Sequence, residues 1–453
     1  MTHSTRDQRL SSHRRRLLQA GATAVTLGAL PGAGQLAANA QGSFDWKKFK
    51  GEKIEVFLVK SPRGDLLTKY HKEFEDLTGI TVGSEMVPEQ QQRQKAVIEF
   101  NSGNPSFDII AISYHVQKRQ FAKNNWLTDL RPMIADKSLA FPDLDFDDFA
   151  QGGLNYAVEP DGRVNSLPLN LDPWIIYYNK ELFDAKGVAY PKNFPEIVDA
   201  AAKLNDPGKG VSGFVARGLK NANVPVWTSF LLGYGGGFID SRGKLMTDST
   251  EAIEAAKMYQ TLLAKYGPPG VAGFNWNEAQ SLFLQGKAAM WLDGIGFAQP
   301  IEDPTKSKVV GKTGYGVMPP GPKKQVSALF GDGQGISPYS KKKGPSWFYV
   351  QWASNKANQT RMLQAAAGAP VRKSAYAAAQ QSSDFKSPKQ WVECMLTSAR
   401  IAQPGLPIIS PVTEFRDTFG IALTNMINGA DPATELKKAT AEFQPVLDKS
   451  EKT

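Results

Sequence analysis

The sequence predicts an α/β fold organised as two lobes. Two observations lead to this prediction. Strand-like and helix-like segments alternate from residue 53 onward, which is typical of lobes with largely parallel sheets. The roughly 410 residues that follow position 40 also exceed what one ordinary hydrophobic core organises, so two lobes are expected.

The first part of the chain supplies the strands and helices of one lobe. We expect strands at 53–59, from 80 onward and at 107–112, and helices at 65–77 and about 90–100. The segment 107–112 (FDIIAI) is nearly continuous in apolar residues, as in a strand buried on both faces. Gly79 ends the first helix as a left-handed cap, and His71 falls on the polar side of that helix, where we expect it in solvent.

The segment 167–183 (LPLNLDPWIIYYNKELF) is typical of a chain that crosses between two structural units. Its first half is extended, because a proline excludes helix at the residue before it and cannot donate to a central ladder. Its second half is rich in β-branched and aromatic residues and reads as a strand that leads into a short helix.

The later part of the chain alternates in the same way and ends in helices. We expect a helix at about 249–266 that Asp248 can cap, a helix at 277–285, a strand at 287–292, and further strands near 315–321 and 331–337. Helices are expected at 346–354, at 358–366 and at the end of the chain, where Asp431 caps the last helix and Pro432 occupies its first turn.

Three phrases occur in a fixed order along this chain: P…YYNK-LF-A-G from Pro168, F-x-x-G-K-A-A-M-x-x-x-G from Phe283, and N-G-x-D-P-x-x-x-L-x-x-A from Asn428. Together they resemble the extracellular solute-binding proteins of carbohydrate ABC importers, the family of the maltose-binding protein. The resemblance covers nearly the whole chain after the leader. The order of the three phrases is stronger evidence for this resemblance than any one phrase.

The resemblance implies a two-lobed periplasmic binding protein fold with three inter-lobe crossings and a C-terminal helical extension of lobe two. It places 44–166 plus 295–334 in lobe one and 167–294 plus 335–453 in lobe two. The crossings, and therefore the hinges, are expected at 167–172, near 290–294 and near 335–337.

Residues 1–40 have the pattern of a twin-arginine-type signal peptide. Arg14, Arg15 and Arg16 precede a weakly apolar stretch, and Ala38-Asn39-Ala40 is a small-x-small cleavage pattern, so we expect cleavage after Ala40. An ordinary Sec leader with additional arginines is the alternative. Since no cysteine follows the apolar stretch, the expected product is a periplasmic protein without a lipid anchor, whose precursor meets the Tat export machinery.

Composition argues against several other functions. The leader carries five arginines and one aspartate of a chain with net charge +9, so the remainder has a charge of +5 without a long basic run, and we expect no nucleic-acid partner. Cys394 is the only cysteine and lies in a helix-like segment, so we expect a buried structural thiol. His71 and His115 are the only histidines after the leader, and no second ligand stands at metal spacing, so we expect no metal, cofactor or catalytic triad.

Aromatic and polar residues gather beside the breaks in predicted structure. Such a mixture suits a carbohydrate, whose C–H faces stack on rings and whose hydroxyls need hydrogen-bond partners when they are buried. Each aromatic residue taken alone is also consistent with a place in the core. Arg372, in a G-x-P-x-R phrase whose arginine often faces the ligand in related binding proteins, could instead form a surface ion pair. The residues expected to contact the ligand are Ser61, Arg63, Tyr114, His115, Asn170, Asp172, Trp174, Trp227, Tyr234, Trp276, Trp291, Asp293, Asp332 and Arg372.

The sequence thus predicts a monomeric substrate-binding component of an ABC transporter that closes on a sugar, oligosaccharide or polyol and delivers it to the permease. Two alternatives stay open. The same fold could bind a glycerophosphodiester, a sugar phosphate or another anion, which the positive charge and the two arginines Arg63 and Arg372 favour. An exported polysaccharide-active enzyme is the second, since Asp293 and Asp332 could act as an acid and a base.

Overall fold

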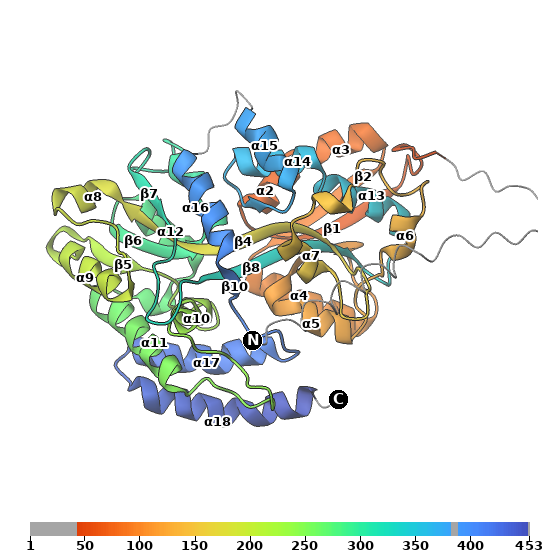
Figure 1. Ribbon diagram of the computed structural model, residues 1–453. Coiled ribbons are helices and arrows are strands. Elements are labelled where there is room, and N and C mark those ends of the chain that lie inside the picture. Colours follow the sequence, from red (N-terminus) through yellow and green to blue (C-terminus); the bar gives the residue numbers. More distant parts are fainter. Residues whose placement is uncertain (1–42, 382–387, 452–453) are drawn as a thin grey trace, which may run out of the picture. The chain divides into compact units, whose positions relative to one another are not determined.

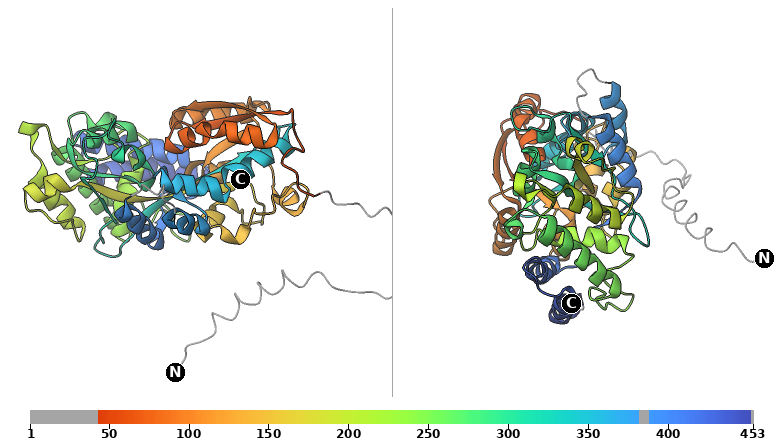
Figure 2. Two further views of the ribbon diagram at one scale, coloured as in Figure 1. Left: turned by 90° about the horizontal axis from the view of Figure 1, so that it is seen from above. Right: turned by 90° about the vertical axis from the view of Figure 1, so that its left-hand side faces the viewer.

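The computed structural model describes residues 43–381 and 388–451. The predicted signal peptide lies outside these residues. The described chain is a mixed α/β structure, which confirms the predicted fold class. Figures 1 and 2 show strands β4 and β8 passing between two groups of helices, and the C-terminal helices α17 and α18 side by side.

Ten strands of the described chain are joined by hydrogen bonds. They are β1 (Lys53–Val59), β2 (Thr81–Val87), β3 (Ile109–Ser113), β4 (Leu167–Asn179), β5 (Ser212–Val215), β6 (Ala288–Gly294), β7 (Thr313–Gly316), β8 (Ser327–Ile336), β9 (Ala369–Pro370) and β10 (Ala402–Pro404). Their order is β2-β1-β3-β8-β4-β6-β5, with β10 also paired to β8 and with β7 and β9 paired to β4.

Helices connect and cover these strands. In the first half of the chain they are α2 (Pro62–Lys69), α3 (His71–Thr78), α4 (Glu89–Ser102), α5 (Tyr114–Lys123), α6 (Arg131–Ala135), α7 (Gln151–Ala157), α8 (Lys180–Ala185), α9 (Phe194–Leu204) and α10 (Val224–Gly233). In the second half they are α11 (Thr250–Gln260), α12 (Trp276–Leu284), α13 (Lys343–Ala353), α14 (Lys356–Gln364), α15 (Lys373–Gln381), α16 (Lys389–Arg400), α17 (Val412–Ile427) and α18 (Pro432–Glu451).

Strand β4 belongs to both halves of the sheet system. Its first part, Leu167–Pro173, pairs with β8, and its second part, Trp174–Asn179, pairs with β6 and β7. The first half of the system also contains the parallel strands β2, β1 and β3. The predicted extended run and the predicted strand are therefore one continuous strand that links two sheets.

Each half has apolar cores on both faces of its strands, because successive side chains of a strand point in opposite directions. In β1, Ile54 and Val56 face a core that contains Trp347 of α13, whereas Phe57 faces the core beneath α4. In β4, Ile176 and Ile175 likewise belong to two different cores.

Some local predictions differ from the structure. The expected helix 65–77 is two helices, α2 and α3, which meet at Tyr70. His71 is buried and not solvated: its Nε2 lies 2.8 Å from the hydroxyl of Tyr349, because α13 covers this side of α3. The helix α11 is capped by Ser249, whose side chain accepts from the Ala252 N–H, and not by Asp248.

The strand pairing also departs from the expected division into lobes at two places. The segment 295–334 was expected in lobe one, but its strand β7 pairs with β4 beside the sheet of β6. Helices α13 and α14 were expected in lobe two, yet Trp347, Phe348 and Met362 lie in the core that contains β1. Sequence order does not determine which sheet a strand joins.

Other predictions agree with the structure. Cys394 is a buried free thiol on α16. Asp431 caps α18 by accepting from the Thr434 N–H at 2.9 Å. Apart from these predictions, the described ranges contain no helix that combines the length and apolar character needed to cross a membrane.

Candidate functional site

A cavity of about 80 Å³ lies where the carboxyl ends of β1 and β3 meet the middle of β4 and β8 and the segments after β5 and β6. Seven of the residues predicted from the sequence line the cavity, namely Ser61, Arg63, His115, Asp172, Trp174, Trp276 and Asp332. Residues brought together here come from distant parts of the chain.

Asp172 is a buried carboxylate in the cavity wall. One of its oxygens accepts a hydrogen bond of 2.8 Å from the Gly296 N–H. Burial raises the pKa of Asp172 to about 6, although the nearby guanidinium of Arg63 opposes this shift. The carboxylate is thus poorly compensated by the protein and is suited to accept hydrogen bonds from a solute's hydroxyl groups.

Arg63 and Asp332 form the second polar element. Arg63 Nη2 lies 2.6 Å from Asp332 Oδ2, and the Asn170 amide donates to the same oxygen at 3.3 Å. Ser61 holds this corner in place, because its hydroxyl oxygen caps α2 by accepting from the Gly64 N–H. Asn170 itself is fully buried and does not line the cavity, so it supports Asp332 from behind.

Aromatic rings form the apolar part of the wall. Trp276 stacks on Phe297 with 4.8 Å between ring centroids, is only partly buried and lines the cavity. Trp174 is almost fully buried between Phe330, at 5.1 Å, and the guanidinium of Arg217, at 5.1 Å.

Asp293 does not line the cavity, contrary to expectation, because it pairs with Arg217. Arg217 Nε and Nη2 donate to the two Asp293 oxygens at 2.9 and 2.5 Å. Burial would lower the pKa of Arg217, but the Asp293 carboxylate outweighs it and raises that pKa. The pair therefore keeps Arg217 charged, and it is Arg217 that faces the cavity.

Three further charged residues line the cavity: Glu89, Arg93 and Arg416. Glu89 Oε1 lies 3.1 Å from Arg93 Nη1. Burial alone would raise the pKa of Glu89, but Arg93, Arg217 and Arg416 lower it to about 2. Burial, with the neighbouring Arg93, lowers the pKa of Arg416 to about 9.

Several buried polar atoms of the wall lack a partner in the described part of the chain. They include Arg63 Nη1, Arg93 Nε and His115 Nδ1. Burial also lowers the pKa of His115, so its ring is neutral at pH 7. The two guanidinium nitrogens are unpaired buried donors, which are costly, and a bound solute with acceptor oxygens would satisfy them.

Four other predicted residues lie in cores or at packing contacts outside the cavity. Trp227 donates to the Ala252 carbonyl inside α10–α11 packing, and Trp291 stacks on Tyr177 at 4.5 Å. Tyr114 is buried with its hydroxyl 2.8 Å from Ser166 Oγ, and Tyr234 packs on Phe194. These aromatics occupy core positions because their rings fill space between helices and sheets.

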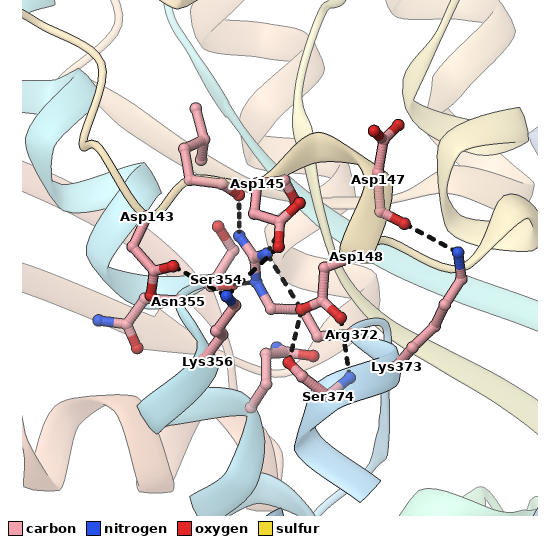
Figure 3. A network of polar contacts seen from close by, with 12 residues as sticks. Asp143, Asp145, Asp147, Asp148, Ser354, Asn355, Lys356, Arg372, Lys373 and Ser374 are labelled. Atoms are coloured by element: carbon pink, nitrogen blue, oxygen red, sulfur yellow. Dashed lines mark hydrogen bonds and ion pairs between the residues drawn. The ribbon is translucent and has the colours of Figure 1, made fainter. Parts of the chain in front are cut away.

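Arg372 is also not a cavity residue, and it is not a surface ion pair. Its buried guanidinium donates to the carbonyls of Ser354 at 2.6 Å and Leu144 at 2.8 Å, and it lies 3.5 Å from Asp148 (Figure 3). It therefore fastens the segment 143–148 to the end of α13.

The sequence reasoning missed Glu89, Arg93, Arg217 and Arg416. Glu89 and Arg217 follow the carboxyl ends of β2 and β5, a position that already pointed to Ser61 and His115. Arg93 and Arg416 lie inside helices, where no local pattern distinguishes them from solvated charges. Among the described residues no cluster of three or more His, Cys, Asp or Glu is arranged to hold a metal ion.

A two-lobed α/β fold with a polar and aromatic cavity that distant chain segments line together defines a solute-binding protein. Residues 60–360 match the family of bacterial extracellular solute-binding proteins, and the chain belongs to this family. The family consists of binding proteins and not of enzymes.

Individual relatives are consistent with this assignment. The chain is 26% identical over 454 residues to the erythritol/L-threitol-binding protein of Mycolicibacterium smegmatis, and the alignment covers 92% of each chain. It is 25% identical over 382 residues to the mannitol-binding protein of Pseudomonas aeruginosa, covering 79% of this chain and 84% of that one. A solute-binding protein from Agrobacterium radiobacter, solved with ribitol, superimposes with a TM-score of 0.79 at 25% identity and covers 88% of this chain and 99% of its own.

Proposed function

We propose that this protein is the substrate-binding component of an ABC importer that captures a small polyhydroxylated solute of the sugar or polyol class. The observation that carries the proposal is the presence in one cavity of a partly buried aromatic ring, Trp276, with the carboxylates Asp172 and Asp332 and the guanidinium of Arg63. Rings meet the C–H faces of such a solute, and the charged groups meet its hydroxyls. The erythritol-, mannitol- and ribitol-binding relatives support the same class.

Capture would proceed by closure of the two lobes around the solute. Contacts already join the two sides: Gln90 of α4 donates to Asn221 at 3.1 Å, and Lys123 of α5 donates to the Ser450 carbonyl at 2.9 Å. We place the bending region where β4 and β8 pass between the sheets, together with the return of the chain near β9. In this division α13 and α14 belong to lobe one and β7 to lobe two.

Export and delivery complete the proposal. The precursor would pass through the Tat machinery, lose its leader after Ala40 and act as a periplasmic monomer without a lipid anchor. The closed form would dock on the permease subunits, and ATP hydrolysis would occur in the transporter. The protein itself would carry out no catalysis.

The test is a thermal-melt and calorimetry panel on residues 41–453 with erythritol, ribitol, D-mannitol, D-glucose and maltose, together with their acidic derivatives. A solute at about 100 times its dissociation constant adds ~2.7 kcal/mol to the free energy of unfolding. At least one polyhydroxylated solute should raise the melting temperature and bind with one-to-one stoichiometry. If none of them binds, neutral or acidic, the proposed function is wrong.

A further inference from the structure

The charged groups of the cavity form two clusters that share Arg217, which interacts electrostatically with both Glu89 and Asp172. Asp172 is influenced by Arg63 and Asp332, which pair with each other. Glu89 is influenced by three arginines, Arg93, Arg217 and Arg416, and all four residues line the cavity. Guanidinium groups are therefore in excess around Glu89, and we call this part of the wall the basic end of the cavity.

At the basic end, two of the three arginines form ion pairs with carboxylates of the protein, and the third does not. Glu89 pairs with Arg93, and Asp293 pairs with Arg217 from behind. Arg416 donates its Nε to the Asn221 carbonyl at 3.1 Å, and no ion pair joins it to a carboxylate within residues 43–381 and 388–451. Its side chain is 2% exposed. A buried charge without a counter-ion is unfavourable, so this end favours an anion.

Two further features act in the same direction. Arg93 Nε is buried without an acceptor in the described chain. The end of the cavity also receives the first residue of the 14-residue helix α4, whose N-terminus has no side-chain cap. The N–H groups at a helix N-terminus carry partial positive charge. Donors thus outnumber acceptors where Arg416, Arg93 and α4 meet.

We propose that the solute has an acidic group, a carboxylate or a phosphate, at one end of its hydroxylated chain, and that Arg93, Arg217 and Arg416 bind this group while Asp172 and Asp332 bind the hydroxyls. The inference rests on the proposed function and narrows its substrate class. A neutral polyol supplies only hydroxyl oxygens to the basic end, whereas an acidic oxygen forms shorter and stronger charge-assisted hydrogen bonds with guanidinium groups.

The experiment compares solutes that differ only at one end of the carbon chain. Calorimetry on residues 41–453 at pH 7.5 would use D-erythronate, D-ribonate, D-gluconate and D-mannonate against erythritol, ribitol, D-glucitol and D-mannitol. The terminal phosphates of the same four polyols form a second arm that separates carboxylate from phosphate. The acidic member of the preferred pair should bind at least tenfold more tightly than its polyol.

Variants with opposite effects on charge test the assignment of the basic end. Arg416→Gln should lower the ratio of acid to polyol affinity about tenfold, whereas Glu89→Gln should raise it. Arg361→Gln is the matched control, because Arg361 pairs with Glu73 outside the cavity, and it should leave the ratio unchanged. Glu89→Gln keeps the test decisive if Arg416→Gln does not fold.

Failure of this inference and failure of the proposed function give different results in these experiments. A carboxylate or a phosphate that binds more tightly than its polyol, with the ratio moved in opposite directions by the two variants, supports the inference. Polyols that bind as tightly as their acids, or a ratio unaffected by both variants, overturns it while leaving the proposed function intact. Absence of binding by every solute overturns both.

Discussion

Replacement of Asp172 by asparagine should stabilise the unliganded protein at neutral pH while weakening solute binding. The folded protein raises the pKa of this carboxyl from 3.8 to about 6, chiefly by burial. A change of about two pK units corresponds to roughly 3 kcal/mol. Because the folded pKa lies above the unfolded one, the folded state holds its proton more tightly, and stability falls as the pH rises from about 4 to about 6. At pH 7.5 the full cost is present.

The asparagine variant removes this cost and keeps the acceptor for the Gly296 N–H. We expect a gain of about 1 to 3 kcal/mol at pH 7.5, since the new amide group also needs acceptors of its own. With an unfolding entropy of about 2.1 cal/mol/K per residue over roughly 400 residues, this gain raises the melting temperature by about 1 to 4 °C. Solute affinity should fall at least tenfold, because a neutral amide is a weaker acceptor than a carboxylate.

The assay is the difference in melting temperature between variant and wild type, measured without solute from pH 4 to pH 8. Contributions from all other groups cancel in this difference. The difference should be near zero at pH 4, rise between pH 4 and 6 and stay constant above. A variant that is less stable at pH 7.5, or a difference that does not change with pH, would refute the reasoning.

Four more predictions rest on other contacts described above. Trp276→Leu should weaken solute binding about tenfold with little loss of stability, since its ring is partly open, and calorimetry on the folded variant checks this. Trp174→Ala should instead cost roughly 3 to 5 kcal/mol of unfolding free energy in urea titrations, because its ring is buried against Phe330 and Arg217; an unchanged midpoint would contradict its place in the wall. Arg372→Gln should lower stability by about 3 kcal/mol yet leave solute affinity unchanged, since it binds carbonyls far from the cavity; a loss of affinity in the folded variant would restore the sequence-based role. Burial lowers the pKa of His71 to about 4, so the stability of the wild type should fall as the pH drops from 6.5 to 4. The variant His71→Phe lacks this titration and should lose less stability across that range, as measured by thermal melts.

Local sequence patterns predicted most helices and strands. The arrangement of the strands could not be predicted, because it depends on pairing between residues far apart in the chain. The β-branched and aromatic run at 174–178 and the caps at Gly79 and Asp431 determine structure through contacts within a few residues, so they could be read directly. The pairing of β7 with β4 depends on residues more than 130 positions apart in the chain, for which a single sequence contains no signal. For this reason the place of β7 beside β4 could not be predicted from the sequence.

The candidate site was predicted in part for a related reason. Residues after strand ends, such as Ser61 and His115, could be located because parallel strands bring their carboxyl ends together. Asp293 was predicted to contact the ligand, but its partner Arg217 is the residue that faces the cavity. Sequence order does not tell which member of an ion pair points inward. Arg416 comes from a helix near the end of the chain, and only the folded structure brings it to Glu89 and Arg93.

The strand that links the two sheets carries two prolines, Pro168 and Pro173, and its register with β8 shifts between Pro168 and Asn170. Neither proline has an amide proton, so deuterium exchange cannot report on these two residues when the lobes move. The partner strand can, because Gly333 stands opposite Pro168 and Gly331 opposite Leu171. Selective ¹⁵N labelling of glycine would therefore place spectroscopic reporters directly across from the bending point without altering a single side chain.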